Sequence, residues 1–158
     1  MESTRAATNG AVSRFRLRGD VAHGPSLLCV EDNDDTRMLL FELLSGEGYE
    51  VTTAATVGDG LEALEDTGGF ALIITDYSLP DGTGISMLET ARIRGHIGAE
   101  TPVLLFTGEP ALEPVEGITL LSKPLQPRIF LRTVRELIES PVPSRESAAS
   151  TTAGDSRL

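Results

Sequence analysis

An α/β fold with a five-stranded parallel sheet is the architecture that this sequence predicts. Five short apolar runs alternate with stretches in which apolar residues recur at helical spacing, and Gly or Pro marks most of the boundaries. Alternating strands and helices are typical of a parallel sheet that helices cover on both faces. With 158 residues, 40% of them hydrophobic, the chain is long enough for one domain with a substantial core.

The apolar runs and the periodic stretches follow one another in a regular order. The predicted strands span residues 27–30, 49–54, 71–75, 103–106 and 118–121. The predicted helices span residues 34–46, 57–66, 84–95 and 128–139. Right-handed crossovers would arrange the five strands in the order 2-1-3-4-5, which is the flavodoxin-like order of a doubly wound sheet.

The two ends of the chain are too poor in apolar residues to form a core. We therefore expect a disordered arm over 1–25, a folded domain over 26–140 and a disordered tail over 141–158. Within the arm, the alternation Phe15-Arg16-Leu17-Arg18 is a weak strand signal that could mark a contact for a partner.

Composition and charge exclude several classes of function. A net charge of −11 argues against a nucleic-acid-binding surface and favours a divalent cation or a basic partner. Cys29 is the only cysteine and lies in an apolar run, so no disulfide framework is expected and a reducing, cytoplasmic location is favoured. No apolar stretch approaches the ~20 residues of a membrane span, and the N-terminus lacks a signal-peptide core.

Acidic residues gather where two of the predicted strands end. Glu31, Asp32, Asp34 and Asp35 follow the first strand, and Asp76 is expected as the first residue past the third. Asp34 or Asp35 can cap the next helix, whereas adjacent carboxylates such as Glu31 and Asp32 repel each other unless they share a cation. The predicted strand order makes the first and third strands neighbours, which places three carboxylates at one edge of the sheet. Such a cluster suits Mg²⁺.

Two further polar side chains are expected at the same edge. Thr107 follows the fourth strand and Lys123 follows the fifth. With a cation in place, Asp76 could act as a carboxylate nucleophile toward a phosphoryl group, and Lys123 could neutralise the transferring oxygens. The hydroxyl of Thr107 could donate to the phosphoryl group. Asp81, by contrast, is expected only to serve the turn around Pro80 and Gly82.

Taken together, these motifs resemble the receiver domain of two-component response regulators over roughly residues 25–140. The resemblance implies Mg²⁺ held by Asp32, Asp76 and the main-chain carbonyl of Ser78, with Glu31 holding a water of the ion. It implies that Asp76 accepts phosphate from the phosphohistidine of a histidine kinase or phosphotransfer protein, assisted by Thr107 and Lys123, and that the phosphoprotein signals to a downstream partner. It also implies a cis bond between Lys123 and Pro124.

The sequence departs from that family in one region. Only 16 positions separate Thr107 from Lys123, and Pro and Glu are frequent between them, so the fourth helix of the family is expected to be short or missing. The position three residues before the lysine is Leu120, where the family usually has an aromatic residue. The end of the fourth strand is similar to a subgroup with a Phe-Ala-Thr-Gly-like motif and a reduced fourth helix.

Three alternatives to a phosphorylatable receiver remain. An aspartyl-phosphate phosphatase would usually carry a second Asp two residues after the nucleophile, but that residue is Ser78. A cofactor binder of the flavodoxin type would present amides to phosphate after its first strand, where this chain has acids. A phosphate-independent interaction module would not need the full set of polar residues. We therefore expect a free-standing regulator, or the receiver of a hybrid kinase, that catalyses its own phosphorylation and dephosphorylation and is otherwise not an enzyme.

Overall fold

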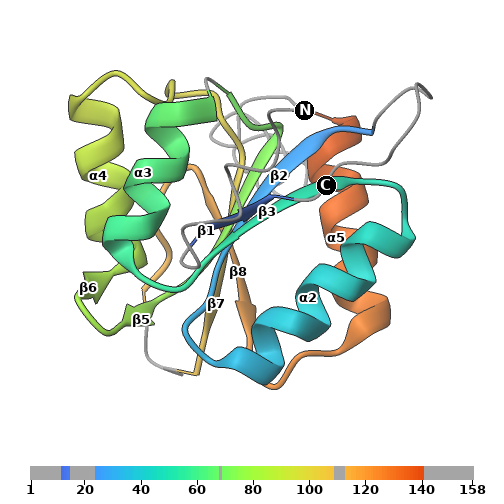
Figure 1. Ribbon diagram of the computed structural model, residues 1–158. Helices are drawn as coiled ribbons and strands as arrows, with labels where there is room; N and C mark the ends of the chain where they lie inside the picture. Colours follow the sequence, from blue (N-terminus) through green and yellow to red (C-terminus); the bar gives the residue numbers. More distant parts are fainter. Residues whose placement is uncertain (1–11, 15–23, 68, 109–112, 141–158) are drawn as a thin grey trace, which may run out of the picture.

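A six-stranded sheet forms the centre of the molecule (Figure 1). The structure is a computed structural model that describes residues 12–14, 24–67, 69–108 and 113–140. The strands of the sheet run in the order β1-β3-β2-β4-β7-β8. Their bounds are β1 (Val12–Arg14), β2 (Ser26–Val30), β3 (Glu50–Ala54), β4 (Leu72–Asp76), β7 (Val103–Thr107) and β8 (Ile118–Ser122).

Five of these strands are parallel and confirm the predicted order 2-1-3-4-5. The central strand β4 pairs with β2 on one side and with β7 on the other, and all five of its residues are buried. Because parallel strands end at the same edge, the residues that close β2, β4, β7 and β8 are brought together there. This edge carries the predicted site.

Helices cover both faces of the sheet. They are α2 (Asp34–Gly46), α3 (Val57–Thr67), α4 (Gly84–Ile93) and α5 (Pro127–Glu139). Figure 1 shows α2 and α5 on one face, and α3 and α4 on the other. The described residues form two apolar clusters, one on each face, in which buried strand residues such as Leu27 and Leu28 point alternately to opposite sides. None of the described helices has the length and apolar character that crossing a bilayer requires.

An additional strand lies at the edge of the sheet, inside the segment expected to be a disordered arm. β1 pairs antiparallel with β3, so that Val12 lies opposite Ala54 and Arg14 opposite Thr52. Three residues give too short a period-2 pattern to be recognised in the sequence. The alternation at Phe15–Arg18 and the tail over 141–158 both lie outside the described residues, as does the remainder of the arm before Gly24 apart from β1.

The segment after β4 forms a small hairpin that the sequence did not predict. Its strands β5 (Ser78–Leu79) and β6 (Gly82–Thr83) pair antiparallel and lead into α4. Asp81 is not confined to this turn, because its carboxylate accepts hydrogen bonds from the main-chain N–H of Val57 (2.7 Å) and Gly58 (3.0 Å). Asp81 therefore caps the N-terminus of α3 from a distant part of the chain.

The connection between β7 and β8 was predicted to have a short or missing helix, and only part of it is described. Of its residues the structure describes Gly108 and 113–117, and these contain no helix. Residues 109–112 lie outside the described part. β8 itself is only partly buried along Ile118–Leu121, as expected for a strand at the end of a sheet.

Candidate functional site

Three carboxylates converge at the carboxyl edge of the sheet. Glu31 directly follows β2, Asp32 comes next, and Asp76 is the last residue of β4 rather than the first residue beyond it. One oxygen from each of the three lies within 4.8 Å of the others. Glu31 and Asp76 are buried, at 1% and 6% exposed, while Asp32 is open to solvent. The predicted neighbourhood of these three acids is therefore present.

Glu31 is held by hydrogen bonds at one carboxylate oxygen and at its main chain. The main-chain N–H of Asn33 donates to its Oε2 (2.9 Å), and its own N–H donates to the carbonyl of Ala54 (2.9 Å). Its Oε1 is buried and accepts no hydrogen bond from the described residues. Burial raises the pKa of Glu31, the charge of Asp76 raises it further, and the Asn33 hydrogen bond opposes this only in part.

Lys123 supplies the positive charge at this edge. Its Nζ lies 2.9 Å from Oδ2 of Asp76 and 3.6 Å from Oε1 of Glu31, the first a hydrogen bond and the second an ion contact only. Burial alone would lower the pKa of Lys123, but the two carboxylates outweigh it and raise the pKa. The peptide bond to Pro124 is cis, as the family resemblance implied.

Thr107 lies at the predicted edge of the sheet, and Ser78 lies in the hairpin that follows Asp76. Thr107 is the last residue of β7 and is 5% exposed. Phe106, the residue before Thr107, pairs in register with Asp76. The carbonyl of Thr107 accepts a hydrogen bond from the N–H of Lys123 (2.9 Å). Ser78 opens β5, two residues after Asp76. The role of its carbonyl as a metal ligand stays a prediction.

Glycine is required where the hairpin returns to the sheet. The N–H of Gly84 donates to the carbonyl of Tyr77 (2.9 Å), and the N–H of Tyr77 donates to the carbonyl of Phe106 (2.9 Å). A Cβ at position 84 would lie only 2.4 Å from the carbonyl oxygen of Asp76 and 2.8 Å from Oγ1 of Thr75. The backbone of Asp76 can therefore keep this position only beside glycine.

The start of α2 corrects one prediction and adds a residue to the site. Asn33, rather than Asp34 or Asp35, caps the helix, with its side chain accepting from the N–H of Thr36 (2.8 Å). Arg37 on the same helix donates from Nη1 to the carbonyl of Glu31 (2.9 Å). No local sequence signal marks this contact, because it depends on the direction in which the Arg37 side chain leaves the first turn of α2.

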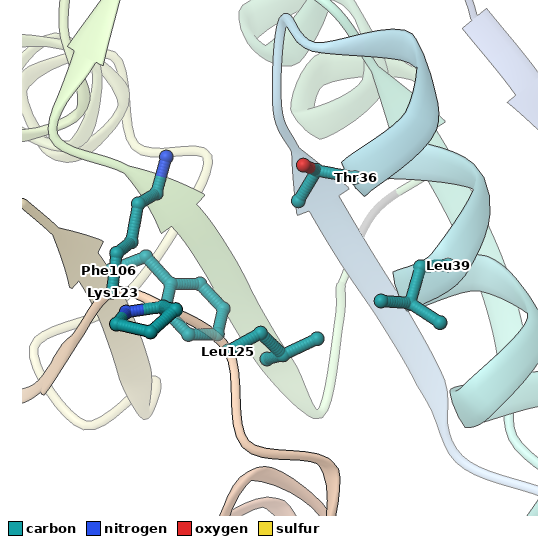
Figure 2. Close-up of a pocket in the computed structure, with 6 residues that line it drawn as sticks. Thr36, Leu39, Phe106, Lys123 and Leu125 are labelled. Atoms are coloured by element: carbon teal, nitrogen blue, oxygen red, sulfur yellow. The ribbon is translucent and has the colours of Figure 1, made fainter.

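A pocket of about 200 Å³ lies beside the carboxylates. Figure 2 shows Thr36 and Leu39 of α2 on one side of it, and Phe106, Lys123 and Leu125 on the other. Apart from the hydroxyl of Thr36 and the amine of Lys123, the groups around it are apolar. The pocket therefore offers apolar contacts next to the charged site.

A match over most of the chain decides to which family it belongs. The model of the response regulator receiver domain matches residues 27–135. The chain belongs to this family. In this receiver domain the sheet edge predicted from the sequence motifs carries the acidic cluster, Thr107 and Lys123.

Individual relatives show how far the likeness extends. The transcriptional regulatory protein DltR of Streptococcus agalactiae is 32% identical over 115 residues, which are 69% of this chain and 50% of that protein. The crystal structure of the receiver domain from the hybrid histidine kinase CckA is 32% identical, with a TM-score of 0.63, over 72% of this chain and 98% of that one. The chemotaxis response regulator CheY4 of Vibrio cholerae is 27% identical, with a TM-score of 0.65 over the same shares. The chain thus spans about half the length of DltR but nearly the whole of both receiver structures.

The residues present fit a hard divalent cation. Three carboxylates offer oxygen ligands within a few ångströms, and Oε1 of Glu31 is a buried acceptor without a hydrogen-bond donor in the described residues. Mg²⁺ prefers oxygen ligands and takes only a few of them from the protein, because it keeps several of its waters. The acidic cluster therefore has the chemistry of the magnesium site that receiver domains carry.

Proposed function

We propose that this receiver domain takes a phosphoryl group onto Asp76 from a phosphohistidine of a histidine kinase or phosphotransfer protein, in a Mg²⁺-dependent reaction. The observation that carries the proposal is the contact of 2.9 Å between Asp76 and Lys123 beside two further carboxylates. A carboxylate oxygen of Asp76 attacks phosphorus, the bond from phosphorus to the imidazole nitrogen breaks, and the imidazole takes up a proton on leaving.

Each neighbouring group has a task in that transfer. Asp32, Asp76 and the main-chain carbonyl of Ser78 would hold Mg²⁺, with Glu31 next to them. When bound, the ion would neutralise charge on the transferring oxygens. Lys123 gives up one of its carboxylate contacts and pairs with a phosphoryl oxygen, and the hydroxyl of Thr107 donates to another. The same groups would support loss of the phosphoryl group to water, which returns the protein to its starting state.

The donor protein is proposed to dock next to the pocket shown in Figure 2. Two large apolar side chains of α2 stand in solvent here, Met38 at 61% and Leu39 at 40% exposed. Leu39 also lines the pocket, whose opposite wall includes Lys123. A partner that covers these side chains would bury apolar area and place its phosphohistidine close to Asp76. The phosphorylated receiver would then act on a downstream protein.

The phosphatase alternative has less support. Ser78 stands where such an enzyme needs an acid, and the contact of Lys123 with Asp76 serves stabilisation of a phosphoryl group rather than protonation of a leaving group. A signalling role also agrees with the receiver family to which the chain belongs.

Small phosphodonors test the proposal without a partner protein. The purified chain is incubated with acetyl phosphate in the presence of Mg²⁺ or of EDTA, next to Asp76→Asn. We expect one phosphoryl group per chain with Mg²⁺ only, labile to hydroxylamine as an acyl phosphate is, and none on the variant. Labelling of the variant, or steady turnover of a phosphoester by the wild type, would contradict the proposal.

A further inference from the structure

One arginine holds the loop that carries Glu31 and Asp32. Nη1 of Arg37 lies 2.9 Å from the carbonyl oxygen of Glu31 and 3.4 Å from that of Asp32. Nη2 of the same guanidinium lies 2.7 Å from Oδ1 of Asp34, and the side chain is 24% exposed. A single planar group thus contacts three residues, Glu31, Asp32 and Asp34, on the path from β2 into α2.

The guanidinium binds the main chain of the two acids and not their side chains in these hydrogen bonds. Arg37 consequently does not occupy the carboxylates of Glu31 and Asp32. Glu31 is held by two further hydrogen bonds, because the N–H of Asn33 donates to its Oε2 and its own N–H donates to the carbonyl of Ala54. Arg37 completes the set of contacts that determine where this loop lies.

We propose that Arg37 is a positioning residue for the cation site. It fixes the main chain of Glu31 and Asp32 so that their carboxylates converge on Asp76. The inference rests on the proposed function, because it requires Mg²⁺ at these three acids. Since Mg²⁺ demands nearly ideal octahedral geometry at about 2.0–2.1 Å, a loop that can shift would bind it more weakly.

Two simpler roles for Arg37 make different predictions about Mg²⁺ affinity. If the guanidinium only neutralised the acids, its removal would strengthen attraction of the cation and tighten binding. If Arg37 only paired with Asp34 to stabilise α2, its removal would leave Mg²⁺ affinity unchanged, and an ion pair whose acid is 87% exposed would contribute little. Positioning predicts weaker binding.

Isothermal titration calorimetry with Mg²⁺ alone separates the three roles on the full chain. We expect Arg37→Ala to weaken Mg²⁺ binding by about tenfold, in line with the loss of partners that orient metal ligands. Arg37→Lys keeps the charge but donates from one point only, so a smaller loss is expected. Asp34→Asn removes the ion pair, and Arg94→Ala removes a charge from the far end of α4; both should stay within about twofold of wild type.

Unchanged or tighter Mg²⁺ binding by Arg37→Ala, with a wild-type circular dichroism spectrum, would overturn the inference. If that variant does not fold, Arg37→Lys decides, and wild-type affinity in it together with a loss in Asp34→Asn would likewise overturn the inference. A wild-type chain that binds no Mg²⁺ would instead overturn the proposed function, and the role of Arg37 with it.

Discussion

The ammonium of Lys123 and the carboxylate of Asp76 are joined by a hydrogen bond of 2.9 Å across 47 positions of sequence. The contact links the ends of β4 and β8, two strands that are separated in the sheet by β7. The Nζ of Lys123 also lies 3.6 Å from Oε1 of Glu31. One side chain therefore offsets much of the repulsion in the acidic cluster, and it competes with a cation for the same oxygens.

Replacing Lys123 by Ala is expected to separate cation binding from phosphoryl transfer. The rate of phosphorylation by acetyl phosphate should fall about 100- to 1000-fold, because a charge that stabilises the transferring oxygens is lost. Mg²⁺ affinity, measured by calorimetry, should be equal to or tighter than that of wild type. The matched control is Arg128→Ala on the exposed side of α5. A variant that is phosphorylated at the wild-type rate would rule out this role for Lys123.

Glu31→Gln is expected to stabilise the protein in a pH-dependent manner. The pKa of Glu31 is raised in the folded state by burial and by Asp76, so the unfolded chain loses this proton at lower pH than the folded one. The wild type therefore loses stability as pH rises from the unfolded pKa, about 4.3, through the raised folded pKa.

The measurement is thermal unfolding without Mg²⁺ at several pH values. Glu31→Gln should unfold at a higher temperature than wild type at pH 8, and the difference should shrink toward pH 4. The same variant should bind Mg²⁺ more weakly. Glu42→Gln, on an exposed position of α2, is the control and should follow the wild type. A larger difference at pH 4 than at pH 8 would contradict the sign of the shift.

Gly84→Ala is expected to disturb the acceptor residue through its backbone. The new Cβ would lie 2.4 Å from the carbonyl of Asp76, so either the hairpin or the end of β4 must move. We expect a loss of about 1–3 kcal/mol in the free energy of unfolding, measured in urea, and slower phosphorylation. Gly46→Ala, whose Cβ would meet nothing within 4 Å, should change stability by less than about 1 kcal/mol. Equal effects of the two substitutions would argue against the steric explanation.

Asp81→Ala is expected to loosen α3 although residue 81 lies in another element. The carboxylate caps Val57 and Gly58, and its loss should cost about 1 kcal/mol of stability at pH 7. Burial alone would raise the pKa of Asp81, but hydrogen bonds from the N–H groups of Val57, Gly58 and Asp81 outweigh it and lower the pKa. The contribution is therefore present above the unfolded pKa, about 3.9, and is lost as pH falls through the lower folded value.

Urea unfolding at pH 7 and pH 3 measures this dependence. The gap between wild type and Asp81→Ala should narrow at the lower pH, and Asp81→Asn should show no such change. Asp66→Ala, at the other end of α3, provides the control and is expected to cost nothing, because a negative charge there opposes the helix dipole. A gap that widens as pH falls would contradict the assignment of the cap.

The order of the sheet and the convergence of its acids could be predicted because both follow from local patterns. Apolar runs define the strands, alternation with helices makes the sheet parallel, and parallel strands deliver their last residues to one edge. Glu31, Asp32, Asp76 and Lys123 all lie at strand ends, so their proximity followed from topology alone.

The contacts that refine this site could not be predicted, because they join parts of the chain that share no local pattern. The cap of Asp81 on Val57 spans 24 positions, and β5 and β6 have two residues each, too few for any period. Asn33 caps α2 because its backbone is extended, whereas Asp34 and Asp35 already belong to the first helical turn. Arg37 reaches the site loop through its side chain, which extends from the first turn of α2 back to the carbonyl of Glu31.

Locating the phosphoryl group on the chain tests the central claim most directly. The protein is treated with acetyl phosphate and Mg²⁺, reduced with sodium borohydride to convert an aspartyl phosphate into homoserine, and analysed by tandem mass spectrometry. The account predicts homoserine at position 76 alone, and none when Mg²⁺ is removed by EDTA. Homoserine at position 32, a modification on His23 or His96, or labelling that is unaffected by EDTA would contradict it.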